Sequence, residues 1–368
     1  MPEKPELLLD RNKTYAVALE GGGARGAYQV GVWRALEEAG IKYNAVSGSS
    51  VGALNGALMT MRDLDQAEKI WSNIRYSMVM DVDDELMKGF FDRSLKLGGV
   101  KSLARYALDA IRAGGIDVTP LREWINSVVD EKAVRASDVE LFIVTYSLSD
   151  MKELDIDVRD LPEGQIGEML LASAYFPAFK NEKIRGKRYS DGGVQDVVPI
   201  NSLITRGYKD LIVVRIYGVG VEKRVRIPDD VSVTTIAPTE DLGSVLDFES
   251  EHAKELMTLG YYDAQRVLHG YVGDKYYLQK TMTEAEAYEF VCATAYTVAA
   301  QTKEDPSLRK VNEEIIPGMA KRLGVKNGDY YDVFIKCMEM AALDKGLPRF
   351  RLITDRELLE ELTHPEQV

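Results

Sequence analysis

Histidine and cysteine are both scarce in this chain of 368 residues, which contains three histidines and two cysteines. Cys292 and Cys337 have neither C-x-x-C spacing nor a histidine close by in the sequence. We therefore expect no zinc site. Two thiols do not make a disulfide framework, and this fits a reducing compartment.

Positively charged residues are fewer than negatively charged ones. The chain has 46 Lys and Arg residues and 59 Asp and Glu residues, and its formal net charge is −13. This balance argues against nucleic-acid binding, which depends on neutralising phosphates with Lys and Arg. It argues equally against electrostatic attachment to anionic lipid surfaces. Two basic stretches, at residues 183–188 and 223–226, lie beside expected strands. We interpret both as solvated faces.

Long hydrophobic runs are missing as well. The first 12 residues are charged and lack the apolar segment of a signal peptide. The most apolar stretch, residues 46–61, is too short for a membrane span and is interrupted by serine, asparagine and threonine. We therefore expect a cytoplasmic protein. A chain of this length can bury a large core in one or two domains.

What the chain does have is two glycine-framed turns about 25 residues apart. The first, Gly21-Gly22-Gly23-Ala24-Arg25-Gly26, directly follows an apolar run at residues 15–19. Such a loop places backbone N–H groups at the start of a helix, which is the arrangement that an oxyanion needs. The N–H groups around Gly22, Gly23 and Ala24 are our oxyanion-hole candidates. Arg25 is a candidate to brace this loop or to add positive potential.

The second turn, Gly48-Ser49-Ser50-Val51-Gly52, fits the G-x-S-x-G pattern of a nucleophile elbow. In that motif a serine lies on a tight strand-to-helix turn with its hydroxyl exposed, so Ser50 is our candidate nucleophile. Gly48 and Gly52 flank it where side chains would collide. Small residues also gather in ordinary turns, and the motif alone is weak evidence. The strand before it, the helix after it and the upstream glycine loop together favour one acyl-transfer site.

Hydrophobic spacing predicts the surrounding elements. Strands are expected at residues 13–19, 41–46, 139–146, 210–217 and 231–238. Helices are expected at residues 27–39, 53–61, 168–175, 246–268, 284–300, 307–323 and 330–343. The first four elements form a βαβα pattern, which is typical of a parallel sheet with helices on its faces. We expect an α/β domain at residues 13–240 and a mainly helical region at residues 241–368, either as a second domain or packed on the first.

A serine hydroxyl is a weak nucleophile until a base takes its proton. The three histidines, all in the expected helical region, are His252, His269 and His364. The chain order still allows a triad of Ser50, Asp191 and His252, but His252 flanks an apolar helical stripe and we interpret it as solvated. Asp191 precedes Gly192-Gly193, a turn able to bring a carboxylate close to another loop. Because D-G is also a common turn dipeptide, spacing alone does not select Asp191.

The glycine loop, the serine elbow and the Asp-Gly-Gly turn, taken in this order, resemble the patatin-like phospholipase family. That family has a G-x-G-x-x-G oxyanion loop, a G-x-S-x-G elbow and an aspartate in a D-G-G/A turn. Shorter stretches that also resemble it are residues 115–117, 120–121, 172–179, 246–248 and 260–264, together with Asp196 and Pro199. The similarity covers roughly residues 13–266.

The resemblance implies a Ser–Asp dyad in which Asp191 takes the proton from Ser50 without a catalytic histidine. It implies a three-layer α/β/α fold around a central, largely parallel sheet. It further implies hydrolysis of acyl esters of lipids through an acyl-enzyme, with no metal and no other cofactor. The expected partners are a lipid or other acyl ester and, transiently, a membrane surface. The motif glycines are Gly21, Gly26, Gly48, Gly52, Gly192 and Gly193.

Alternative interpretations rest on single features. The first glycine loop also fits a dinucleotide-binding fingerprint, but the acidic residue expected to close the second strand is missing from residues 41–46. Residues 81–85 are acidic, yet Leu86 stands where a calcium-binding EF-hand loop needs glycine.

A second function class remains as an alternative: a catalytically weak or partner-activated protein of the same fold that acts as a binding module. Residues 79–114 form either a lid over the site or a helical pair on the sheet edge.

Overall fold

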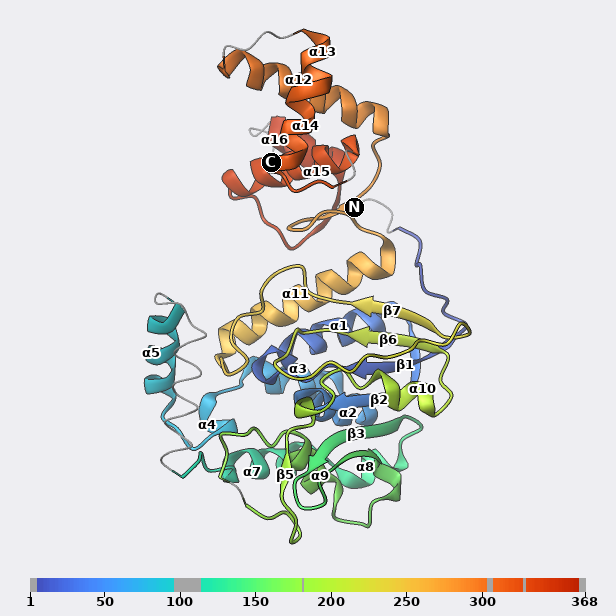
Figure 1. Cartoon of the computed structure of the whole chain (residues 1–368), viewed down its shortest axis with the longest axis vertical. Helices are drawn as coiled ribbons and strands as arrows, with labels where there is room; N and C mark the ends of the chain where they lie inside the picture. The colour runs from blue at the N-terminus through green and yellow to red at the C-terminus, as the bar shows by residue number, and fades with distance from the viewer. Residues whose placement is uncertain (1–4, 96–113, 181, 303–306, 327–328, 364–368) are drawn as a thin grey trace. The chain divides into compact units, whose positions relative to one another are not determined.

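The computed structural model describes residues 5–95, 114–180, 182–302, 307–326 and 329–363 (Figure 1). It divides into two compact units. One comprises Leu9–Ala264, and the other joins Met1–Leu8 to Gln265–Val368. The predicted boundary at residue 240 stays a prediction, since a division of contacts does not test which segment folds by itself.

The larger unit is built on one seven-stranded sheet. Its strands are β1 (Thr14–Leu19), β2 (Lys42–Ser49), β3 (Glu140–Ser147), β4 (Lys152–Asp157), β5 (Tyr189–Ser190), β6 (Asp210–Val214) and β7 (Ser232–Ile236). They lie in the order β4-β3-β2-β1-β6-β7, with β5 also paired to β3. The five strands from β3 to β7 along this order are parallel, whereas β4 and β5 run antiparallel to β3. The predicted, largely parallel sheet is therefore confirmed.

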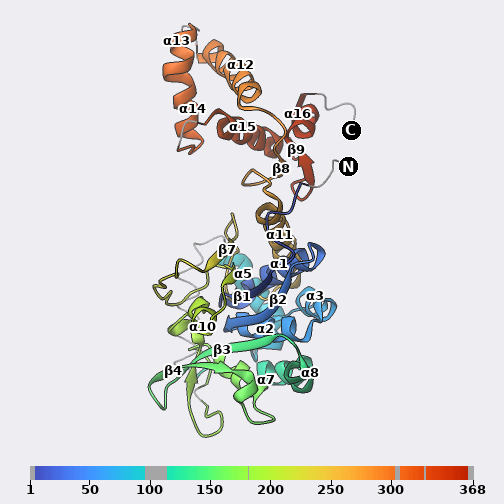
Figure 2. The same cartoon turned by 90° about the vertical axis from the view of Figure 1, so that its right-hand side faces the viewer.

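Helices cover both faces of this sheet (Figure 2). Ala16 and Ala18 of β1 belong to a buried cluster with Ile200 and Leu203 of α10 (Ile200–Thr205). The opposite face carries α1 (Gly26–Glu38), α2 (Val51–Met61) and α3 (Leu64–Ser72). Successive side chains of a strand point to opposite faces, so an almost wholly apolar strand such as β1 is suited to a three-layer core. The expected α/β/α architecture is confirmed.

The βαβα pattern at the start of the chain is confirmed, with one difference. β2 runs on to Ser49, three residues past the predicted end at residue 46. Ser47, Gly48 and Ser49 pair in register with Phe142, Ile143 and Val144 of β3. Pairing with β3 thus extends β2 through polar residues. Ser50 is then the one residue between the end of β2 and the start of α2.

The sixth strand is shorter than predicted, because β6 ends at Val214 instead of residue 217. Beyond it, the backbone N–H groups of Ile216, Tyr217 and Gly218 donate to the side chain of Glu20 at 2.7, 3.0 and 3.1 Å. A buried carboxylate therefore takes the place of a strand partner there. β4 and β5 were not predicted, since β4 is polar and half exposed and β5 has two residues.

The remaining helices of this unit are α4 (Tyr76–Val79), α5 (Asp84–Leu95), α7 (Thr119–Val128), α8 (Glu131–Ala136), α9 (Ile166–Ser173) and the first part of α11 (Ser250–His269). Residues 96–113 of the proposed lid lie outside the described residues. Among the helices that the structure describes, none is both long and apolar enough to cross a membrane.

The smaller unit is mainly helical, as predicted. Its helices are α12 (Glu284–Thr302), α13 (Leu308–Lys310), the π-helical turn η4 (Val311–Ile315), α14 (Ile316–Arg322), α15 (Tyr330–Asp344) and α16 (Asp355–Thr363), beside the two-stranded sheet of β8 (Tyr277–Gln279) and β9 (Leu352–Thr354). It has its own apolar core, in which Phe334 and Met338 are fully buried. The helix predicted at residues 307–323 is interrupted by η4.

Candidate active site

Ser50 lies in a strained turn between β2 and α2. Its φ and ψ angles are 55° and −126°, a conformation that side-chain-bearing residues seldom adopt. A Cβ atom on Gly48 would lie 2.3 Å from the carbonyl carbon of Gly52, and a Cβ atom on Gly52 would lie 2.3 Å from the carbonyl oxygen of Leu19. Only glycine fits at these two positions. The local sequence thus produces the strand–turn–helix context that a nucleophile elbow requires.

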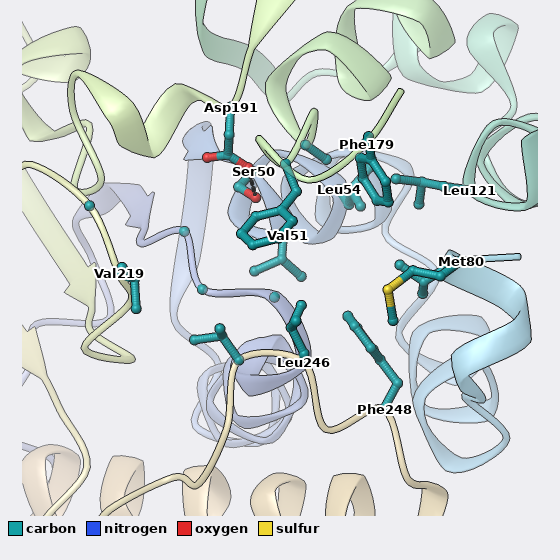
Figure 3. Close-up of a pocket in the computed structure, with 18 of the residues that line it drawn as sticks. Ser50, Val51, Leu54, Met80, Leu121, Phe179, Asp191, Val219, Leu246 and Phe248 are labelled. Atoms are coloured by element: carbon teal, nitrogen blue, oxygen red, sulfur yellow. Dashed lines mark hydrogen bonds between the residues drawn. The ribbon is translucent and has the colours of Figure 1, made fainter. Parts of the chain in front are cut away.

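Ser50 and Asp191 are brought together across 141 residues of sequence (Figure 3). The hydroxyl of Ser50 donates a hydrogen bond to Oδ2 of Asp191 at 2.6 Å. The other carboxylate oxygen, Oδ1, accepts from the backbone N–H of Gly193 at 2.8 Å, so the Gly-Gly turn orients the carboxylate. This is the geometry in which a carboxylate can take a proton from a hydroxyl.

Burial raises the pKa of Asp191 from 3.8 to about 6. The hydrogen bonds from Ser50 and Gly193 oppose this shift, because both favour the charged carboxylate. Desolvation is the larger effect. The carboxylate is therefore a stronger base than an exposed aspartate and is still mostly ionised at neutral pH.

Two residues at and just beyond the end of α9 support this pair, and the sequence predicted no role for either. The hydroxyl of Ser173 accepts a hydrogen bond from the backbone N–H of Ser50 at 2.9 Å and donates one to the carbonyl of Val144 at 2.6 Å. The carbonyl of Tyr175 accepts from the backbone N–H of Asp191 at 2.9 Å. Both belong to the stretch 172–179 that resembles the family, which was the available signal.

The glycine loop after β1 leaves two of its N–H groups available. The N–H groups of Ala24 and Arg25 are occupied, since they donate to the carbonyls of Val245 at 2.8 Å and Gly22 at 3.3 Å. Those of Gly22 and Gly23 have no partner among the described residues, and both glycines line the cavity beside Ser50. Of the candidate residues in this loop, which are Gly22, Gly23, Ala24 and Arg25, the first two therefore have the free donors.

Arg25 braces this loop. Its guanidinium donates to the carbonyl of Gly243 from Nε at 2.9 Å and from Nη2 at 2.6 Å, and to the carbonyl of Ile216 at 3.3 Å. Glu20, which is 1% exposed, forms an ion pair with Arg215 at 2.9 Å besides holding the N–H groups after β6. Glu20 was missed in the sequence because it belongs to no motif. Together these two charged side chains connect the glycine loop to the segments after β6 and before α11.

Ser50 and Asp191 lie on the wall of a cavity of about 270 Å³. Its other walls are almost entirely apolar, and they include Val51, Leu54, Trp71, Ile74, Met80, Leu121, Phe176, Phe179, Val197, Val219, Leu246 and Phe248. Figure 3 shows Leu121, Met80 and Phe248 across the pocket from Val219, with the Ser50–Asp191 pair between. An apolar chamber with a few convergent polar groups suits a hydrophobic ligand with one reactive polar bond.

Neither of the two described histidines is among the residues that line this cavity. Nε2 of His252 is 3.1 Å from the carbonyl of Leu242, and this side chain is not among the cavity residues. His269 belongs to the smaller unit, where Nδ1 is 2.8 Å from the carbonyl of Pro5. His364 lies outside the described residues. Among the described residues, the hydrogen bonds of the Ser50 and Asp191 side chains do not involve His252.

Sequence comparisons place this arrangement among known proteins. Lysophospholipase nte1 of Aspergillus terreus is 55% identical over 53 residues, which are 14% of this chain and 3% of that protein. Patatin-like phospholipase domain-containing protein 7 of Rattus norvegicus is 44% identical over 73 residues, or 19% of this chain and 5% of that protein. The chain thus matches only a small part of these curated relatives.

Among solved structures, VipD from Legionella pneumophila aligns over 94% of this chain and 89% of its own, with 12% identity and a TM-score of 0.39. The sequence model of the family described as "Patatin-like phospholipase" matches residues 17–204, just over half of the chain. That range includes the glycine loop, the serine elbow and the Asp-Gly-Gly turn. The chain therefore belongs to the patatin-like phospholipase family.

Proposed function

We propose that this chain is a serine acyl hydrolase that cleaves carboxylic ester bonds of lipids, phospholipids among them. The observation that carries the proposal is the 2.6 Å hydrogen bond from Ser50 to Asp191 on the wall of an apolar cavity. Family membership supports the same substrate class. Ser50 acts as the nucleophile, Asp191 as the general base, and the N–H groups of Gly22 and Gly23 as the oxyanion hole.

In the first half of the reaction, Oγ of Ser50 attacks the ester carbonyl carbon while its proton passes to Oδ2 of Asp191. The carbonyl oxygen becomes negatively charged and is stabilised by the free N–H groups of Gly22 and Gly23. When the carbon–oxygen bond to the alcohol breaks, Asp191 returns the proton to the leaving oxygen. The products are a free alcohol and an acyl ester on Ser50.

In the second half, a water molecule attacks the acyl carbon and gives its proton to Asp191. The bond to Oγ of Ser50 then breaks, the proton returns to that oxygen, and a carboxylic acid leaves. The raised pKa of Asp191, about 6, suits both proton transfers near neutral pH. The apolar walls bind the acyl chain by removing its surface from water.

The test is hydrolysis of p-nitrophenyl acyl esters from short to long chains by the wild type and by Ser50→Ala and Asp191→Asn. We expect turnover to fall by at least about a thousandfold in both variants. Mass spectrometry of the wild type after a fluorophosphonate probe should place the adduct on Ser50. Unchanged turnover in Asp191→Asn would rule out this base. A folded wild type that neither turns over any ester nor reacts with the probe would favour a partner-activated or binding protein.

A further inference from the structure

A segment of five residues that follows β6 exposes an unusual amount of apolar surface. Its sequence is Tyr217-Gly218-Val219-Gly220-Val221. The side chains of Tyr217, Val219 and Val221 are 54%, 80% and 52% exposed. They alternate with two glycines, so the side chains of this segment that are larger than hydrogen are two valines and one tyrosine, and all three are more than half exposed. Burying such side chains stabilises a protein, and their exposure costs that stabilisation unless something covers them.

The backbone of this segment is held firmly against the catalytic loops. A Cβ atom on Gly218 would lie 1.7 Å from the carbonyl oxygen of Gly21, and one on Gly220 would lie 2.4 Å from that of Gly193. The N–H of Val221 donates to the carbonyl of Gly193 at 2.8 Å. The glycines thus allow close contact with the glycine loop and with the Asp-Gly-Gly turn. The side chains of Tyr217, Val219 and Val221, which alternate with these glycines, therefore point away from the glycine loop and from the Asp-Gly-Gly turn.

Two residues of the same segment lie on the wall of the cavity. Val219 and Gly220 line the cavity, and so does Val194, which is 40% exposed. Figure 3 shows Val219 on the opposite side of the pocket from Leu121 and Met80, which are 3% and 1% exposed. Through Val219, the exposed apolar surface therefore adjoins the apolar wall of the cavity that contains Ser50.

We propose that Tyr217, Val219 and Val221 dock this protein on the surface of lipid aggregates, so that a lipid enters the cavity directly from the layer into which these side chains insert. This inference rests on the proposed lipid hydrolysis and adds the surface by which the substrate is reached. Three side chains cannot supply the roughly 800 Å² per partner of a stable protein interface. They do suffice for shallow insertion at a membrane interface.

The net charge of the chain does not favour a contact with anionic lipid, although Arg224 and Arg226, which follow Val221 in the sequence, are exposed. The neighbouring Arg215 and Glu222 are paired with each other at 2.8 Å, and the chain carries a net charge of −13. Binding is therefore apolar, and it persists on zwitterionic lipid and at high salt. This is compatible with the expectation that the chain does not attach to anionic lipid by electrostatics.

The binding test uses the full chain with Ser50→Ala, which keeps the vesicles intact, and sedimentation with sucrose-loaded phosphatidylcholine vesicles. The parent should bind, and adding Tyr217→Ser with Val221→Ser should weaken the partition coefficient by about tenfold or more. Raising the salt from 0.1 to 1 M should not release the parent. Leu308→Ser, at a site 59% exposed in the other unit, is the matched control and should bind as the parent does.

Activity separates this proposal from the proposed function. With Ser50 intact, the Tyr217→Ser/Val221→Ser protein should hydrolyse a monomeric short ester as the wild type does but lose about tenfold on vesicles. Equal vesicle binding by parent and double variant, or no binding by the parent, overturns the docking surface even if hydrolysis is normal. Lost vesicle binding in a protein that hydrolyses no ester supports the surface and contradicts the proposed enzyme.

Discussion

The hydroxyl of Ser173 accepts a hydrogen bond from the backbone N–H of Ser50 at 2.9 Å. Ser173 is fully buried, and its own proton goes to the carbonyl of Val144 in β3. Two residues further on, the carbonyl of Tyr175 holds the N–H of Asp191. One short segment at the end of α9 therefore supports the backbone of both members of the proposed dyad, and it keeps the strained turn at Ser50 in place.

We expect Ser173→Ala to lower kcat by about 10- to 100-fold with little change in KM. Removing the acceptor leaves a half-buried N–H without a partner, which costs roughly 1–3 kcal/mol and lets the turn at Ser50 relax. Steady-state kinetics with a soluble ester measure kcat and KM separately for the variant and the wild type. Ser202→Ala is the control, since Ser202 is also buried but bonds Asp155. Wild-type kcat in Ser173→Ala would show that the contact does not position the nucleophile.

The pH dependence of kcat/KM should show an acid limb with a midpoint near 6. Burial raises the pKa of Asp191 to about 6, and the base works only when ionised, so activity is lost as the pH falls through that value. A profile from pH 4 to 9 on a soluble ester measures the midpoint. A midpoint near 4 would contradict the prediction, because it would mean that burial does not raise the pKa of Asp191.

Asp191→Asn should stabilise the folded protein above pH 6 while removing its activity. The pKa of Asp191 is about 6 in the folded chain and 3.8 as a reference. The Asp191 carboxyl therefore binds its proton more tightly in the folded state than in the unfolded state. Its contribution to the free energy of unfolding falls as the pH rises from about 4 to 6. The neutral amide avoids that loss, which is on the order of 1–3 kcal/mol.

Thermal unfolding at pH 7.5 and pH 4 provides the measurement for this variant. The melting temperature of Asp191→Asn should exceed that of the wild type at pH 7.5, and the difference should shrink at pH 4. A lower melting temperature at pH 7.5 would mean that the hydrogen bonds of the carboxylate to Ser50 and Gly193 outweigh its desolvation.

Leu121→Trp should shift the enzyme toward shorter acyl chains. Leu121, which is 3% exposed, lies across the cavity from Val219, so a larger side chain there shortens the space for a chain that begins at Ser50. We expect kcat/KM for long esters to fall by about tenfold or more, with short esters nearly unchanged. Comparing a p-nitrophenyl ester series for both proteins measures the shift. A uniform loss at all lengths would instead indicate distorted packing.

Much of the catalytic half was predictable because its information is local. A buried apolar run, a glycine turn and an amphipathic helix predicted β1, α1 and α2 within two residues of their ends. By contrast, β2 was predicted too short, since its last residues are polar and are held in the strand by pairing with β3. β4 and β5 carry no apolar pattern of their own, and only their pairing with β3 makes them strands.

The site divides in the same way. The elbow at Ser50 follows from its own sequence, because Gly48 and Gly52 stand where no side chain fits. Spacing did not choose Asp191, and the resemblance to a family was needed, since nothing local to a D-G-G turn says which loop it will meet. The donors of the glycine loop also could not be ranked from sequence. The N–H of Ala24 is occupied by Val245, which is 221 residues away along the chain.

The sequence by itself thus determined the parallel α/β pattern, the strained serine turn and the scarcity of histidine that turned attention to a carboxylate. The resemblance to a family selected Asp191, whereas only the tertiary structure decided that Ser173 and Glu20 hold the surrounding backbone and that Tyr217, Val219 and Val221 are exposed, with Val219 on the cavity wall. The reason is physical. Turns and helices depend on neighbours in sequence, whereas burial, desolvation and the pKa of Asp191 depend on segments that meet only when the sheet assembles.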